Sequence, residues 1–217
     1  SASPTAFTYP TPTAAAQMLV GSTGATNPDA WDSWKIRRAF GRHVLTTLAD
    51  ATTSAVDTRM DAATDAENAF AEAFGSYLQM AIDGQSVLTD GLTASTGTAF
   101  DAETPVLVSP KGRDVTGWVV AAFNDLLDGA NESWDTLDGS GLGLDDPAVV
   151  AATMAPPVTT TDFYARWLTA GLDAVAISRN WIHHGLVSDD ALESNDASSE
   201  AAPIGADYVD GVFHRYD

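Results

Sequence analysis

Two adjacent histidines, His183 and His184, are the residues in this sequence best suited to bind a metal ion. On a helix, successive side chains diverge by roughly 100°, so the two imidazoles cannot easily share one ion. The sequence has no Cys, no HExxH motif and no acidic calcium-binding loop. We therefore expect no metal site and no cofactor. We instead assign both histidines to the end of a helix, where they interact favourably with the helix dipole.

Motifs for nucleophilic catalysis and phosphate binding are absent from the sequence as well. No serine lies in a GxSxG motif. The glycine-rich run at 139–143 lacks the lysine and hydroxyl residue of a phosphate-binding loop. Paired carboxylates carry little information in a chain with 30 acidic residues. We therefore predict no catalytic residue, although a site assembled from distant residues would leave no local motif.

Lys35, Arg38 and Arg42 form a basic flank within the segment Trp31–Arg59, which holds half of the ten basic residues. At about 100° per residue, the three cations lie together on one edge of an amphipathic helix. The adjoining apolar arc consists of Trp34, Phe40, Val44, Leu45, Leu48 and Val56. We expect the basic flank to bind an acidic neighbour such as another subunit. The alternative is that these cations pair with carboxylates of their own chain.

The remaining periodic segments predict a mainly α fold, a helical bundle over residues 31–187. A break near residues 51–54 is favoured over one unbroken helix, because a helix of about 50 residues is far longer than average. We expect at most a short β element near 104–110. The further helices are expected near Asp61–Ile82, over Asp114–Leu127 with Asp114 as N-cap, from Asp146-Pro147 to Pro156, and from a Thr161 or Asp162 cap to Gly185.

Two terminal segments are expected to extend from this helical domain as arms. Residues 1–30 contain four prolines among small residues and are expected to form an extended arm; a floppy tail is the alternative. Residues 188–202 have the acidic, small-residue composition of a linker. Aromatic residues follow this linker and predict an anchor that docks on another surface; a disordered terminus is the alternative. The anchor residues are Tyr208, Val212, Phe213 and Tyr216.

The net charge of −20 indicates an unusual solvent environment. It arises from 24 Asp and 6 Glu against 8 Arg and 2 Lys, a composition similar to proteins of extremely halophilic archaea. At molar salt the Debye length is about 3 Å, so repulsion between surface carboxylates is screened. An acidic protein from ordinary salt is the alternative. This charge disfavours sequence-specific nucleic-acid binding, and the absence of a long apolar run predicts no membrane partner.

A helical body with two peripheral arms is similar in layout to the head–tail connector (adaptor) proteins of tailed viruses. The resemblance covers the general plan from about Trp31 to Asp217 and rests on no specific motif. It implies a homo-oligomeric ring that docks on other virion proteins such as a portal. Localisation would then be the virion, after assembly in the cytoplasm of a halophilic host. A minor capsid or tail component fits nearly as well, and a halophilic cytoplasmic enzyme or regulatory domain is the rival from another class.

Overall fold

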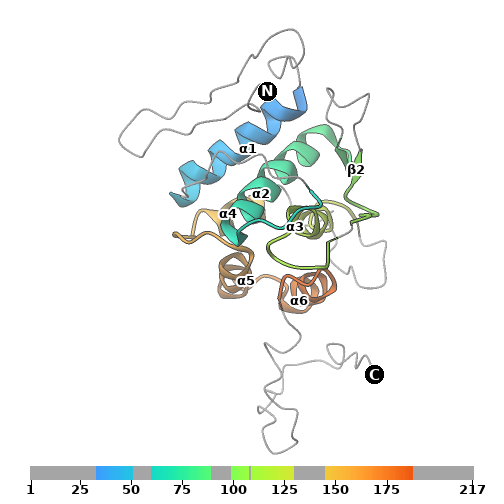
Figure 1. Cartoon of the computed structure of the whole chain (residues 1–217). Coiled ribbons are helices and arrows are strands. Elements are labelled where there is room, and N and C mark those ends of the chain that lie inside the picture. The colour runs from blue at the N-terminus through green and yellow to red at the C-terminus, as the bar shows by residue number, and fades with distance from the viewer. Residues whose placement is uncertain (1–32, 51–59, 89–98, 108, 130–144, 188–217) are drawn as a thin grey trace, which may run out of the picture.

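The structure, a computed structural model, describes residues 33–50, 60–88, 99–107, 109–129 and 145–187. This part of the chain is mainly α, as the sequence predicts. In Figure 1, α2 and α3 lie centrally, with α1 on one side and α5 and α6 on the other. The helices are α1 (Ser33–Ala49), α2 (Ala66–Asp83), α3 (Thr116–Asn124), α4 (Asp145–Ala151), α5 (Thr160–Thr169) and α6 (Ala174–His183). The two predicted arms, 1–30 and 188–217, lie outside the described residues.

Local signals set the bounds of α1 and α2. Helix α1 ends before Asp50, whose φ of 51° lies in the left-handed region, so the predicted break between the two helices is confirmed. Helix α2 begins after Asp65, whose side chain accepts a hydrogen bond from the Asn68 amide. It ends at Gly84, which has the left-handed conformation of a helix C-cap. Helix α2 therefore starts later than expected and stops where expected.

The side of α1 that is buried differs from the predicted apolar arc. Phe40 was expected to face inward, but 45% of its surface is exposed. Leu45 is fully buried, and Arg38 and Arg42 are nearly so. The apolar arc was therefore partly wrong, because α1 turns small residues and paired arginines, and not Phe40, towards α2.

The β structure lies earlier in the chain than predicted. Strands β1 (Val87–Leu88) and β2 (Phe100–Asp101) form a short antiparallel pair, with Leu88 opposite Phe100. Residues 105–107 are not in a strand, and Val106 is 95% exposed, so the expectation of a β element near 104–110 was wrong for the residues described there. The proline at 105 removes one backbone donor and disfavours strand pairing at this place.

Helix α3 is shorter than predicted and buried on almost every side. Asp114 is not its N-cap; Val115 occupies that position, without a side-chain hydrogen bond. Val119 and Phe123 are fully buried, as the periodicity indicates. The buried residues of α3 include small and polar ones as well, because α2 covers one side of the helix and α6 another.

The single helix predicted over residues 161–185 is two helices. Helix α5 begins after Thr159, whose hydroxyl accepts from the Asp162 amide at 3.3 Å. Gly171, with φ 74°, turns the chain, and Asp173 then caps α6 by accepting from two backbone amides. Gly185 follows α6 as expected. The turn reverses the chain, so that α6 can return along α5.

An aromatic cluster forms the core where α2, α3, α5 and α6 meet. Phe123 of α3 lies at its centre, 5.2 Å from the Phe163 ring and 6.0 Å from the Trp181 ring. The α2 rings Phe70 and Tyr77 contact Phe123 from the other side, at 5.7 and 5.3 Å. All five side chains are buried. Burial of each contributes roughly 1.5–3 kcal/mol before the cost of ordering it.

Candidate functional site

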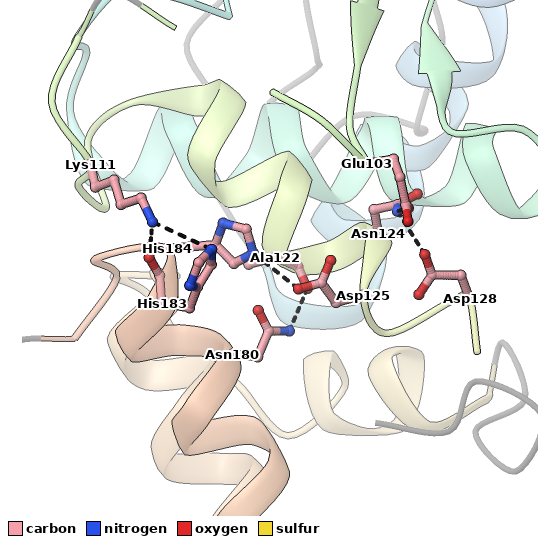
Figure 2. A network of polar contacts seen from close by, with 9 residues as sticks. All are labelled: Glu103, Lys111, Ala122, Asn124, Asp125, Asp128, Asn180, His183 and His184. Carbon is pink, nitrogen blue, oxygen red and sulfur yellow. Dashed lines mark hydrogen bonds and ion pairs between the residues drawn. The ribbon is translucent and has the colours of Figure 1, made fainter. Parts of the chain in front are cut away.

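A buried carboxyl–imidazole contact joins the C-terminal ends of α3 and α6 (Figure 2). His184 Nε2 lies 3.0 Å from Asp125 Oδ2. Asp125 directly follows α3 and His184 directly follows α6, so each is fixed by a helix terminus. Only 5% of Asp125 and 3% of His184 is exposed. The contact therefore links two residues far apart in the sequence within the protein interior.

Asn180 joins the same two helices one turn before His184. Its Nδ2 donates to the Ala122 carbonyl of α3 at 2.8 Å, and the side chain is fully buried. Asn180 and His184 are four residues apart, so they lie on one face of α6 (Figure 2). This face is polar within an otherwise apolar contact, and its polar atoms orient α6 against α3.

Lys111 closes the exposed end of this network. Its Nζ donates to the His183 carbonyl and lies 3.4 Å from His183 Nε2 (Figure 2). The ammonium also lies 5.3 Å from the centroid of the Trp118 ring. A Cβ at Gly185 would lie 2.8 Å from Lys111 Cβ, so the segment before α3 packs tightly on the end of α6. Lys111 thus places a positive charge at a helix C-terminus, where it is favourable.

Acidic groups flank Asp125 on the other side. Asn124 Nδ2 donates to Glu103 Oε2 at 2.9 Å and to Asp128 Oδ2 at 3.1 Å (Figure 2). Glu103 follows β2, and its negative charge disfavours ionisation of Asp125. The network therefore carries positive charge at its Lys111 end and negative charge at its Glu103 end.

Burial sets the protonation of the central pair. Removal from water, together with the Glu103 charge, raises the pKa of Asp125 from 3.8 to about 8. Burial and the Lys111 ammonium lower the pKa of His184 from 6.5 to about 3. Burial, His184 and Lys111 lower the pKa of His183 to about 4. At neutral pH Asp125 is consequently protonated and His184 is neutral. Besides the proton of the neutral imidazole ring, the pair thus holds one proton and has no net charge.

The network contains the residue types of a proton-transfer site, but a substrate cannot reach them. Asp125 and His184 are enclosed, so neither can touch a substrate in this conformation. Within the described part of the chain, no group of three or more His, Cys, Asp or Glu residues is arranged to hold a metal ion. What the arrangement does is fasten α6 to α3. No sequence pattern predicted a role for Asp125; the available signal was the pair of polar residues Asn180 and His184 at i, i+4 positions on α6.

Two residues of the basic flank, Arg38 and Arg42, lie in the interior, and the side chain of the third, Lys35, is not described. Arg38 and Arg42 both form ion pairs with Glu72 of α2, and all three are at least 93% buried. This is the internal pairing considered as the alternative. The Lys35 side chain is not among the described ones. Whether the flank also contacts another subunit stays a prediction, as it does for the C-terminal residues Tyr208, Val212, Phe213 and Tyr216, which are not described.

Large apolar side chains are exposed on α1, α4 and α5. They are Phe40 on α1, Val149 on α4 and Leu168 on α5, with 45%, 58% and 39% exposure. Helix α4 contacts both α1 and α5, and in Figure 1 it lies between them. Exposed apolar side chains on adjoining helices are a feature of surfaces that bind other proteins.

The chain matches no protein-family model, no curated protein and no solved structure. The candidate sites therefore depend on this chain's own geometry. Among the helices that the structure describes, none is long and apolar enough to cross a membrane.

Proposed function

We propose that this protein is a non-enzymatic structural subunit of a virion from a halophilic host, a ring-forming head–tail connector (adaptor) protein. In this proposal the helical domain is a bundle, and the segments 1–30 and 188–217 are arms that dock on neighbouring subunits and on other virion proteins such as a portal. The observation that carries an assembly role is the exposure of Phe40, Val149 and Leu168 on adjoining helices.

The exposed apolar residues support an assembly role because of their setting. The chain has a net charge of −20, so its surface is otherwise strongly acidic. At high salt, charge attraction between subunits is screened, whereas burial of apolar side chains is strengthened by many salts. Apolar contacts on α1, α4 and α5 are therefore well suited to hold subunits together in a halophilic host.

A halophilic cytoplasmic enzyme or regulatory domain is the rival proposal. Its best catalytic candidate among the described residues is the pair Asp125 and His184. Both side chains are enclosed and already engaged in joining α3 to α6. The geometry of this pair therefore favours a structural role over catalysis.

Light scattering in multimolar KCl tests the proposal through the assembled mass. We expect the full chain to form particles of several 22.7 kDa subunits. The triple variant Phe40→Ser, Val149→Ser and Leu168→Ser should fold but shift towards the monomer. Val106→Ser is the matched control, because Val106 is 95% exposed and lies outside these helices. A monomer at every concentration, or normal assembly of the triple variant, would overturn the role of this surface.

Removal of residues 208–217 tests the C-terminal anchor separately. We expect an unchanged helical circular dichroism spectrum together with reduced assembled mass, since aromatic anchors contribute roughly 1.5–3 kcal/mol each when buried on a partner. If the truncated chain unfolds, these residues belong to its own core. If it assembles normally, the anchor is dispensable.

A further inference from the structure

We propose that Asp125 and His184 form a proton-dependent latch that fastens the C-terminal end of α6 to α3. The proposal does not depend on the proposed function, because it concerns only contacts within the chain. Its basis is the 3.0 Å contact between two enclosed side chains from different helices. The arrangement in the structure is the closed state of the latch. The pair can exchange protons with solvent only in an open state, in which the end of α6 has moved away from α3.

The imidazolium form of His184 is poorly accommodated by its surroundings. Nε2 contacts Asp125, but Nδ1 is buried and has no hydrogen-bond partner among the described residues. With Asp125 protonated and donating to Nε2, the neutral ring already carries its proton on Nδ1. A second ring proton at Nε2 would give the enclosed pair a net positive charge, which destabilises the closed position. The Lys111 ammonium, facing the histidines from the segment before α3, disfavours this second positive charge further.

The ionised form of Asp125 is also disfavoured while His184 is neutral. The carboxyl is removed from water, and Glu103 faces it from the segment after β2. Asp128, one turn further along from Asn124, adds another carboxylate to the same end of the network. Only the state in which the pair holds one proton avoids a net buried charge. Gain or loss of that proton should therefore open the latch.

The direction of the pH effect follows from the protons bound in the closed and open states. Opening exposes Asp125, whose pKa falls from about 8 towards 3.8, so the closed state weakens as pH rises from about 6.5 to 8. The histidines act in the opposite direction: their exposed pKa of 6.5 exceeds the closed values, so acid weakens the closed state. Below pH 6.5, opening lets two histidines each gain a proton and one carboxyl lose a proton, so acid favours the open state. The latch is consequently tightest near pH 6.5.

The change in the opening equilibrium above pH 6.5 should be large enough to measure. A difference of one bound proton changes the opening equilibrium by up to about tenfold per pH unit. A buried contact is also screened by salt much less than a surface one, so the effect should persist in multimolar KCl.

Hydrogen exchange of the full chain in multimolar KCl, followed by mass spectrometry, tests the latch. After correction for intrinsic exchange rates, peptides from 174–187 should lose protection between pH 6.5 and 8, by up to about tenfold per pH unit, relative to peptides of α2. Asp125→Asn cannot ionise and should abolish this alkaline loss. Asp128→Asn is the matched control, a neighbouring carboxyl outside the pair, and should retain it.

Two results would overturn the latch. One is an alkaline loss of protection in Asp125→Asn equal to that of the unmodified protein. The other is a carboxyl carbon resonance of Asp125 in the unmodified protein that titrates near 3.8, as an exposed aspartate does. The resonance measurement needs no variant, so it decides the proposal even if Asp125→Asn fails to fold.

Discussion

Gly41 of α1 and Gly75 of α2 bring the backbones of the two helices into direct contact. A Cβ at Gly41 would lie 2.7 Å from Gly75 Cα, and a Cβ at Gly75 would lie 2.6 Å from the Arg38 carbonyl oxygen. Both obstacles are backbone atoms, which cannot turn aside as a side chain does. The close approach places Arg38 and Arg42 within reach of Glu72.

Gly75→Ala should separate α1 from α2. Alanine favours a helix by up to about 1 kcal/mol relative to glycine, but the clash with Arg38 should exceed this gain and destabilise the fold by roughly 1–3 kcal/mol. Urea denaturation measures the change. Gly129→Ala is the control, because its Cβ would meet no atom within 4 Å among the described residues, its chain neighbours aside. Equal stability of the two variants would contradict the close contact.

Glu72→Gln should destabilise the protein by about 3 kcal/mol, because it removes the carboxylate that pairs with two buried arginines. Glu67→Gln, in the first turn of the same helix, should change stability by less than about 1 kcal/mol. Thermal melts compare the two. A Glu72 variant as stable as the Glu67 variant would mean that the ion pairs contribute little.

Separate substitutions of the basic flank should give different results. Arg38→Gln and Arg42→Gln should lower the melting temperature, since each breaks a buried ion pair with Glu72. Lys35→Gln alone tests the predicted contact with an acidic subunit, read as assembled mass at unchanged melting temperature. If Lys35→Gln leaves the assembled mass unaltered, Lys35 does not contribute to a subunit contact.

Asp173→Ala should destabilise α6 by about 1 kcal/mol, because Asp173 Oδ1 accepts hydrogen bonds from the Val175 and Ala176 amides. Asp173→Asn retains a side-chain oxygen that can accept both hydrogen bonds, so it should destabilise α6 by at most a few tenths of a kcal/mol. Chemical denaturation at high salt, where the charge is screened, isolates the hydrogen bonds. Equal losses for both variants would show that charge, not hydrogen bonding, supports this helix start.

The melting temperature of the whole protein should rise steeply with KCl up to about 1 M. The net charge of −20 makes the folded state self-repulsive in dilute buffer, and salt screens that repulsion. Circular dichroism melts across a KCl series measure the effect. A melting temperature that stays constant from dilute buffer to multimolar KCl would remove the argument for a halophilic protein.

Most helix positions follow from local sequence signals, because these signals act within a few residues. Glycine at positions 84 and 185 permits the left-handed conformation that ends α2 and follows α6. The spacing of Phe70, Phe74 and Tyr77 likewise identified the buried side of α2. Such local chemistry does not depend on what the rest of the chain does.

Which polar residues are enclosed depends on contacts between segments that are far apart in the sequence. Glu72 draws Arg38 and Arg42 inward, although helical periodicity alone allows an exposed basic flank. Asp125 and His184 are 59 residues apart, and no pattern in either segment specifies that they meet. Their contact depends on the turn at Gly171 that returns α6 across α3. Long-range packing, rather than local preference, therefore makes the candidate site.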